Sequence, residues 1–358
     1  MMNLTCQVCS SILKGSMTAI TQKSSNPLAA RTTKDTLFER ALSVVWNVRH
    51  PLSPFCESLL PVPDRLTYQT QDNHRVTIER FPNSRGRGEP ILICTGPLIH
   101  SRILRLGEGQ FLRSLQENGF DVYLFAHRGQ RNAKAPKEQI YNHSWNDIIN
   151  HDLPCAIDAI KRYTKASRIF LLGHGLGGLL TYSWLSMGGS RDLVGNITID
   201  APALYTPHNI PLRYTIINKV LSHIQQYPTK ALAQLQAQRS PIFHPEMSPE
   251  KSRGILHHCL ENISPNMVHQ LASWLKTGRF CSDTQYHLST IRNCTLPKLL
   301  LAGAHEELSS YVSFTNDSLT KGTYQKKTWK HLPFWEDAHQ PIDSIVSWST
   351  DLRNYCWE

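Results

Sequence analysis

One stretch near the middle of the chain, residues 167–180, constrains the fold more than any other. Residues 169–172 are all apolar, which is typical of a strand buried in a parallel sheet. A glycine-rich turn follows at 173–178, and the apolar segment after it, 179–185, is expected to be a buried helix. A strand that leads through a tight turn directly into a helix is the layout of the nucleophile elbow, G-x-S-x-G.

The glycines of this turn match the elbow motif except at its centre. Gly173, Gly175 and Gly177 have the spacing of G-x-S-x-G, but Gly175 stands where the motif has its serine. Glycine has no side chain to attack a carbonyl carbon, although it avoids the cost of about 1–3 kcal/mol that a strained backbone imposes on other residues. A phosphate-binding turn is the alternative, but the spacing does not fit G-x-x-x-x-G-K-[ST] and is not a clean G-x-G-x-x-G. The sequence therefore predicts an elbow that lacks its nucleophile.

The composition limits the class of protein. A chain of 358 residues is long enough for one large α/β domain with an insertion, or for two domains. No apolar run reaches the ~18 residues of a membrane span. The formal net charge is +10, but the basic residues are scattered apart from those at 127–137, without the basic stripe and interleaved aromatics of nucleic-acid-binding proteins. We therefore expect no transmembrane segment, no nucleic-acid partner and no cofactor.

The cysteines and the first residues bear on the compartment. Nine cysteines are spread along the chain, and the lone C-x-x-C pair, Cys6 and Cys9, has no second pair nearby to complete a zinc site. Free thiols are typical of a reducing compartment, so we expect a cytoplasmic protein without a metal site. Residues 1–34 contain no Asp or Glu and many Ser and Thr, which indicates a disordered tail or an organellar transit peptide.

The residues before the glycine-rich turn alternate between strand and helix patterns. A helix is expected at 35–48, followed by a Pro-rich linker at 51–63. The linker leads into two strands, 65–70 and 74–81, joined by turn residues at 71–73. The other elements expected before residue 203 are strands at 90–95, 121–125 and 193–199, a helix at 106–118, and a long helix from Ser144 to about residue 164 with Ser144 as its N-cap.

The pattern changes after residue 203, where helical spacing replaces the strands. An inserted helical cap is predicted at 204–293, with helices at 212–225, 229–238, 249–260 and 265–276. Strands at 296–302 and 324–331 and a closing helix at 339–354 follow. The expected division is a tail at 1–34, a helix with its linker at 35–63, a core in two parts at 64–203 and 294–358, and the cap between them. The alternation in the core predicts an α/β fold with a mostly parallel sheet and helices on both faces.

Taken as a set, these motifs resemble the α/β-hydrolase superfamily, and most of all bacterial hydrolases related to acid lipases and polyhydroxyalkanoate synthases. The likeness covers roughly residues 65–355. Its specific parts are Ser-Trp-Asn-Asp at 144–147, His-Asp-Leu-Pro at 151–154, Gly-His-Gly-Leu-Gly-Gly at 173–178, Thr-Gly-Arg-Phe at 277–280 and the strand that begins with Leu-Pro at 296. The resemblance implies an α/β-hydrolase sheet with an inserted helical cap.

The resemblance also implies positions for a catalytic triad, in the order nucleophile, acid and histidine. Gly175 stands at the nucleophile position. Glu306, with Glu307 as the second choice, follows the strand after which the family has its acid, although two solvated loop carboxylates are the alternative. His339, one of 17 histidines, precedes the closing helix and would be the general base.

An oxyanion hole of two backbone N–H groups is implied beside the elbow. One N–H is expected from Leu176, the residue after the nucleophile position. The other is expected at Pro97, which has no N–H, so this donor is lost unless Leu98 replaces it. Loss of one such donor lowers the rate on the order of 10²–10³-fold. Gly96 and His174 are expected to line the ligand pocket.

Two independent departures, at Gly175 and Pro97, thus fall on the groups that perform the reaction. We predict a catalytically impaired or non-catalytic member of the fold that binds a small acyl or lipid-like molecule or a protein partner. The alternative is an active esterase, lipase or acyltransferase with another nucleophile, for which Cys94 and then His174 are the nearest candidates, or an enzyme inactivated by exchange of its serine for glycine.

Overall fold

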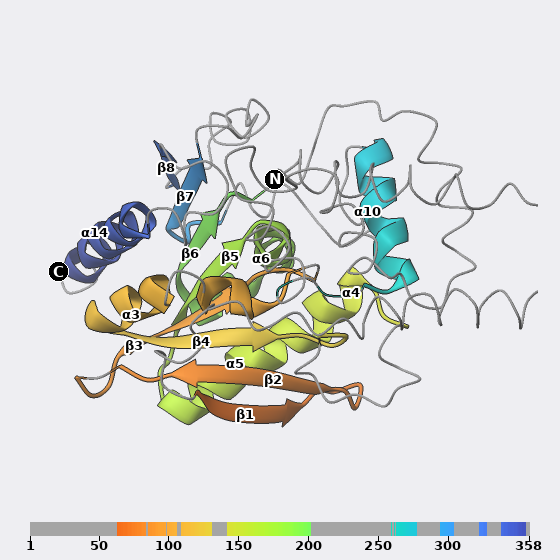
Figure 1. Ribbon diagram of the computed structural model, residues 1–358, viewed down its shortest axis with the longest axis horizontal. Helices are drawn as coiled ribbons and strands as arrows, with labels where there is room; N and C mark the ends of the chain where they lie inside the picture. The colour runs from red at the N-terminus through yellow and green to blue at the C-terminus, as the bar shows by residue number, and fades with distance from the viewer. Residues whose placement is uncertain are drawn as a thin grey trace, which may run out of the picture.

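An eight-stranded sheet, in the order β1-β2-β4-β3-β5-β6-β7-β8, forms the centre of the computed structural model (Figure 1). The structure describes residues 63–83, 85–97, 99–105, 109–130, 142–201, 259, 261, 263–277, 294–303, 322–327 and 338–355. The strands are β1 (Asp64–Gln69), β2 (Arg75–Phe81), β3 (Glu89–Cys94), β4 (Phe120–Ala126), β5 (Ile169–His174), β6 (Leu193–Ile199), β7 (Lys298–Gly303) and β8 (Gly322–Lys327).

The sheet is mostly parallel. The pairs β1–β2 and β2–β4 are antiparallel, whereas the five pairs from β4–β3 to β7–β8 are parallel. The predicted turn at 71–73 joins β1 to β2, and Asn73 has the positive φ of 64° that such turns favour. The predicted α/β sheet is therefore confirmed. Its parallel strands end at one edge, where the turn at Gly175 lies.

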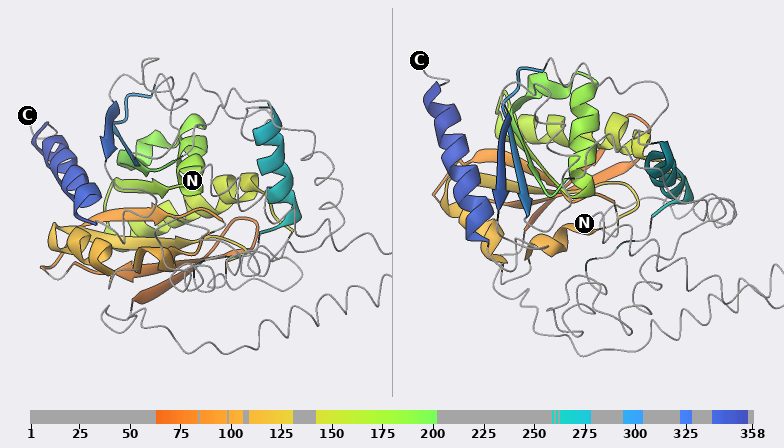
Figure 2. Two further views of the ribbon diagram at one scale, coloured as in Figure 1. Left: turned by 45° about the horizontal axis from the view of Figure 1, so that its top comes forward. Right: turned by 90° about the horizontal axis from the view of Figure 1, so that it is seen from above.

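Helices cover both faces of this sheet, as predicted (Figure 2). On one face, α5 (Leu153–Thr164) and α6 (Leu176–Ser186) pack against inward-pointing strand residues such as Ile78, Leu92 and Leu171. On the other face, α3 (Gln110–Glu117) and α14 (His339–Tyr355) pack against Ile91 and Phe170. The alternation along β3 and β5 divides their apolar side chains between the two faces, which are therefore both buried.

Two helices differ in detail from their sequence patterns. The helix expected at 106–118 begins at Gln110, because Gly109 takes a left-handed conformation with φ 71°, and residues 101–105 form a separate 3₁₀ helix, η2 (Ser101–Arg105). The long helix from Ser144 has the expected N-cap, a capping box with Asp147, on the short α4 (Trp145–Asp147). It then passes through a π-helical segment, η4 (Ile148–Asp152), before α5.

Part of the predicted cap lies within the described residues. The helix expected at 265–276 is present as α10 (Pro265–Thr277). The Trp145 indole Nε1 donates to the carbonyl oxygen of Met267 at 3.2 Å, and the backbone N–H of Trp145 donates to Gln270 Oε1 at 2.8 Å. The start of α10 is therefore fixed to the start of the long helix.

Several predicted segments lie outside the described residues. They are the tail at 1–34, the helix and most of the linker at 35–63, the cap helices at 212–225 and 229–238 with nearly all of 249–260, and the second half of the strand at 324–331. Among the described residues, no helix combines the length and the apolar character needed to cross a membrane.

Candidate functional site

The turn between β5 and α6 has an unusual backbone at its centre. Gly175 has φ 55° and ψ −124°, a conformation that strains any residue with a β-carbon. The N–H of Gly175 donates to the carbonyl oxygen of Ile199 at 2.9 Å, and its own carbonyl oxygen accepts from Gly178 N at 2.9 Å. The turn is therefore fixed on both sides, and a residue at position 175 is held at the carboxyl edge of the sheet whatever its side chain.

This backbone gives a stability prediction for Gly175→Ala. We expect the free energy of unfolding to fall by about 1–3 kcal/mol in a denaturant titration, because the new β-carbon enters a strained region. Gly188→Ala is the matched control: Gly188 also has a positive φ, 90°, but with ψ 15° and open space around it, so its loss is expected to be smaller. A Gly175→Ala variant as stable as the unaltered protein would contradict the claim that the backbone at position 175 strains a residue with a β-carbon.

The start of α6 lies directly against the turn that follows β3. A β-carbon placed on Gly177 would lie 2.0 Å from the carbonyl oxygen of Cys94, and one on Gly96 would lie 2.7 Å from Gly177 N. Contacts this short need glycine on both sides. The turn containing Gly96, which has φ 86°, and the turn containing Gly175 are therefore two backbone segments in direct contact.

The two segments differ in the backbone N–H donors that they offer at this edge of the sheet. The first N–H groups of a helix have no partner within it, so Leu176, the first residue of α6, presents its N–H at this edge. Pro97, which follows Gly96 in the other segment, is buried and contributes no N–H. Leu98 lies outside the described residues. The described part of the site therefore offers one backbone donor at Leu176 and none at Pro97.

The turn after β3 is held by Gln130, from the turn after β4, and by its own Thr95. Gln130 Nε2 donates to the carbonyl oxygens of Gly96 at 3.2 Å and Ile99 at 3.4 Å, and Thr95 Oγ1 donates to Ile99 O at 2.7 Å. His127 is buried, and its Nδ1 donates to the carbonyl oxygen of Arg128 at 2.6 Å. Burial lowers the pKa of His127 to about 4, so this imidazole is neutral at pH 7.

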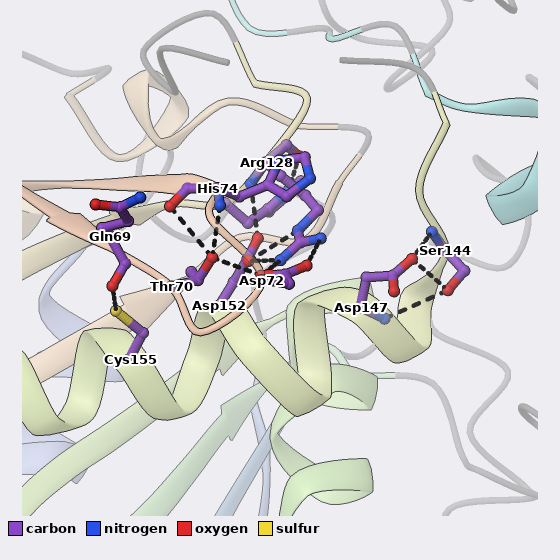
Figure 3. A network of polar contacts seen from close by, with 10 residues as sticks. Gln69, Thr70, Asp72, His74, Arg128, Ser144, Asp147, Asp152 and Cys155 are labelled. Carbon is purple, nitrogen blue, oxygen red and sulfur yellow. Dashed lines mark hydrogen bonds and ion pairs between the residues drawn. The ribbon is translucent and has the colours of Figure 1, made fainter. Parts of the chain in front are cut away.

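Arg128 is the centre of a buried polar network (Figure 3). Its Nε and Nη2 donate to Asp152 Oδ1 at 2.8 and 2.7 Å, and its backbone N–H donates to Asp152 Oδ2 at 2.8 Å. Its Nη1 and Nη2 also donate to the two oxygens of Asp72 at 2.6 and 2.9 Å. The network ties the β1–β2 turn and the π-helical segment to the turn that supports Gly96.

The two carboxyl groups of the network have opposite pKa shifts. Burial raises the pKa of Asp152 to about 6, although Arg128 donates to both of its oxygens. The half-exposed Asp72 is desolvated less than Asp152, and hydrogen bonds from Arg128 and Thr70 hold its pKa well below the usual range. Asp152 belongs to the His-Asp-Leu-Pro segment of the family resemblance, but nothing local in that segment predicts its contact with Arg128.

His339 is the first residue of α14, and its side chain is exposed. Four turns further along this helix, Arg353 pairs with Glu89, the first residue of β3, at 2.6 Å. The helix therefore runs antiparallel to β3, and its His339 end points toward the edge of the sheet where Gly175 lies. His339 Nε2 is 2.8 Å from the side-chain nitrogen of Gln110. Glu306 and Glu307 lie outside the described residues.

The two alternative nucleophiles named from the sequence are both deeply buried. Cys94 is 1% exposed at the end of β3, and burial raises the pKa of its thiol far above the ordinary value. His174 is fully buried under the turn, and burial lowers the pKa of its imidazole to about 3. A thiol that resists ionisation is a poor nucleophile.

The buried neutral histidines predict sensitivity to acid. His127 and His174 have folded pKa values below their unfolded value, so the unfolded chain binds protons more strongly and stability falls as pH drops below about 6.5. We expect a loss of about 4 kcal/mol from these two groups between pH 7 and 5, of which the raised pKa of Asp152 offsets about 1 kcal/mol. Chemical denaturation at several pH values should therefore measure a net loss of about 3 kcal/mol, and His127→Gln, which removes about half of the histidine contribution, should leave about 1 kcal/mol. A flat profile of the unaltered protein would contradict this.

Comparisons with known proteins agree with this geometry. The family model described as serine aminopeptidase, S33, matches residues 91–331. The chain belongs to this family of α/β-hydrolases. The matched region begins in β3 and includes the turns at Gly96 and Gly175 and all of the predicted cap at 204–293. The resemblance stated from the sequence motifs is therefore confirmed at the level of the family and of the fold.

The curated relatives of this α/β-hydrolase are lipases. Triacylglycerol lipase 2 of Arabidopsis thaliana is 29% identical over 155 residues, which cover 39% of this chain and 37% of the lipase. Lipase lipl-3 of Caenorhabditis elegans is 26% identical over 132 residues, 33% of each chain. The chain thus spans about a third of the length of the curated relatives it matches.

Solved structures share the fold over a larger part of the chain. A carboxylesterase of Nitrososphaera gargenis matches 81% of this chain and 99% of its own with a TM-score of 0.58 and 12% identity. A thermophilic esterase of Thermogutta terrifontis matches the same shares with a TM-score of 0.58 and 15% identity. At such identities the likeness shows the fold alone.

Proposed function

We propose that this α/β-hydrolase binds a small acyl or lipid-like molecule at the carboxyl edge of its sheet and is catalytically impaired or non-catalytic. The observation that carries the proposal is Gly175. Its backbone keeps the strained conformation of a residue presented at a strand-to-helix turn, and its side chain supplies no oxygen or sulfur. In this proposal Gly175, Glu306 and His339 correspond to the nucleophile, acid and base positions.

A second feature supports the proposal independently of the first. The turn containing Gly96 and Pro97 lies against the start of α6, where an oxyanion would need two N–H donors. Leu176 offers one of them, and proline offers none. In this proposal Gly96 belongs to the pocket, His174 lies fully buried beneath the turn, and Leu98 is the remaining candidate for the second donor.

The ligand class follows from the family and from the relatives. Enzymes named as triacylglycerol lipases share sequence with this chain, and the substrates in their names carry acyl chains. The described residues also include four free cysteines, Cys94, Cys155, Cys259 and Cys294. Free thiols are typical of proteins in a reducing compartment, so we propose that the protein lies in the cytoplasm.

Two assays on the same sample test the function. Displacement of a fluorescent fatty acid by dodecanoate measures binding of an acyl chain, with butanoate as the matched control that has too little apolar surface to compete. Release of p-nitrophenolate from p-nitrophenyl dodecanoate measures turnover. We expect displacement by dodecanoate and no turnover above buffer. Repeated turnover would instead support an active esterase with another nucleophile. A lack of displacement by dodecanoate would contradict the acyl ligand and leave a protein partner as the remaining hypothesis.

A further inference from the structure

Gln110 and His339 meet where α3 and α14 begin. The two helices lie side by side on one face of the sheet (Figures 1 and 2). Phe111, Ala338 and Ile342, which flank the pair in sequence, are buried in the same apolar cluster. The cluster fixes the two helix starts relative to each other, so the exposed polar pair sits on a rigid support.

The chemistry of the contact assigns a proton position to His339. The contact joins Gln110 Nε2 to His339 Nε2 at 2.8 Å. An amide nitrogen donates and does not accept, so the imidazole Nε2 must be the acceptor. In a neutral ring with Nε2 as the acceptor, the proton is on Nδ1.

We infer that Gln110 is a positioning residue that occupies the Nε2 lone pair of His339 and holds the ring as the neutral Nδ1–H tautomer. The inference rests on the proposed function, in which His339 stands at the base position of a site without a nucleophile. In a serine hydrolase the nucleophile's hydroxyl is the donor to this nitrogen. Here the glutamine amide on α3 is the donor, and the lone pair is satisfied without a hydroxyl at Gly175.

Nitrogen NMR tests this assignment directly. Long-range ¹H–¹⁵N spectra of the full chain, with His339 identified by the loss of its signals in His339→Gln, distinguish an acceptor nitrogen from a protonated one. At mildly alkaline pH we expect an acceptor shift for Nε2 and a protonated shift for Nδ1. In Gln110→Met, which keeps the length of the side chain and loses the donor, the ring should shift toward the Nε2–H tautomer.

Two further variants sharpen the result. Gln110→Glu replaces the donor by an acceptor and should place a proton on Nε2. Asn118→Ala is the matched control, because Asn118 is another amide residue of the same helix region, its side-chain Nδ2 donates to Ser114 O, and its loss should leave the His339 signals unchanged. A protonated Nε2 in the unaltered protein, or identical His339 spectra in all Gln110 variants, would overturn the inference.

An activity measurement links Gln110 to the site. In a Gly175→Ser, Pro97→Leu background, where hydrolysis is expected to be measurable, the new hydroxyl must compete with Gln110 for Nε2, so adding Gln110→Met should raise ester hydrolysis by about tenfold or more. No gain from Gln110→Met would contradict the competition. Failure of the proposed function is a separate result: it would appear as turnover by the unaltered protein, whereas failure of the inference appears in the His339 spectra of a protein that remains inert.

Discussion

Arg128→Met is expected to lower the free energy of unfolding by about 3–5 kcal/mol at pH 7, measured by chemical denaturation. The methionine fills much of the same volume but removes all the side-chain donors to Asp152, which is fully buried. The buried carboxylate of Asp152 then accepts a hydrogen bond only from the backbone N–H of residue 128. The change also releases Asp72 and so loosens the β1–β2 turn.

The pH dependence of this loss identifies its cause. Without Arg128, the pKa of Asp152 rises further above the unfolded value, so protonation of the folded state relieves the buried charge. The deficit of Arg128→Met should therefore shrink as pH falls from 7 to about 6, below which Asp152 is protonated in both folded proteins. Adding Asp152→Asn to Arg128→Met should restore part of the loss at pH 7, whereas Asp72→Asn alone should cost less because Asp72 is half-exposed. A deficit that is small, or that is independent of pH, would contradict the network as the source.

Gly175→Ser alone is expected to give weak or no hydrolysis of p-nitrophenyl esters, and Gly175→Ser with Pro97→Leu clearly more. The serine returns an oxygen beside the base position, but the turn at Pro97 still lacks an N–H. Because an oxyanion donor is worth about 10²–10³ in rate, the second change should have an effect of that order. Initial rates measured with the two variants side by side provide the comparison.

The controls separate the nucleophile from the oxyanion hole. Pro97→Leu without the serine should be inert, so the two changes together should exceed the sum of their single effects, because both act on the same tetrahedral intermediate. High activity from Gly175→Ser alone, with no gain from Pro97→Leu, would show a hole already complete through Leu98 or another donor. The missing nucleophile at Gly175 would then be the one defect of the site. A recent or engineered replacement of the serine would explain that defect better than a gradual loss of the reaction.

The sheet and the turn at Gly175 could be predicted from the sequence because the patterns that indicate them are local. Apolar runs, glycine spacing and the turn residues at 71–73 act within a few residues of each other, so they can be read along the chain. The N-cap at Ser144 is local in the same sense, and it was predicted. The triad assignment of Glu306 came from a resemblance and remains a prediction.

The polar contacts that support the site were not predictable because they join distant residues. Arg128 meets Asp152 across 24 positions and Asp72 across 56, and Gln110 meets His339 across 229. No local pattern marks these pairs. The π-helical segment that ends at Asp152, the partner of Arg128, also departs from the regular helix that the spacing from Ser144 predicts.

The most direct test of the central claim is the intact mass of the purified chain after incubation with a fluorophosphonate. Such probes bond covalently to an activated serine, and the Gly175→Ser, Pro97→Leu variant serves as the positive control. Because Gly175 offers no nucleophile, the unaltered protein should keep its mass while the control gains one probe per chain. One probe bound per chain of the unaltered protein, at a serine that peptide mapping locates, would contradict the claim that this α/β-hydrolase has lost its nucleophile.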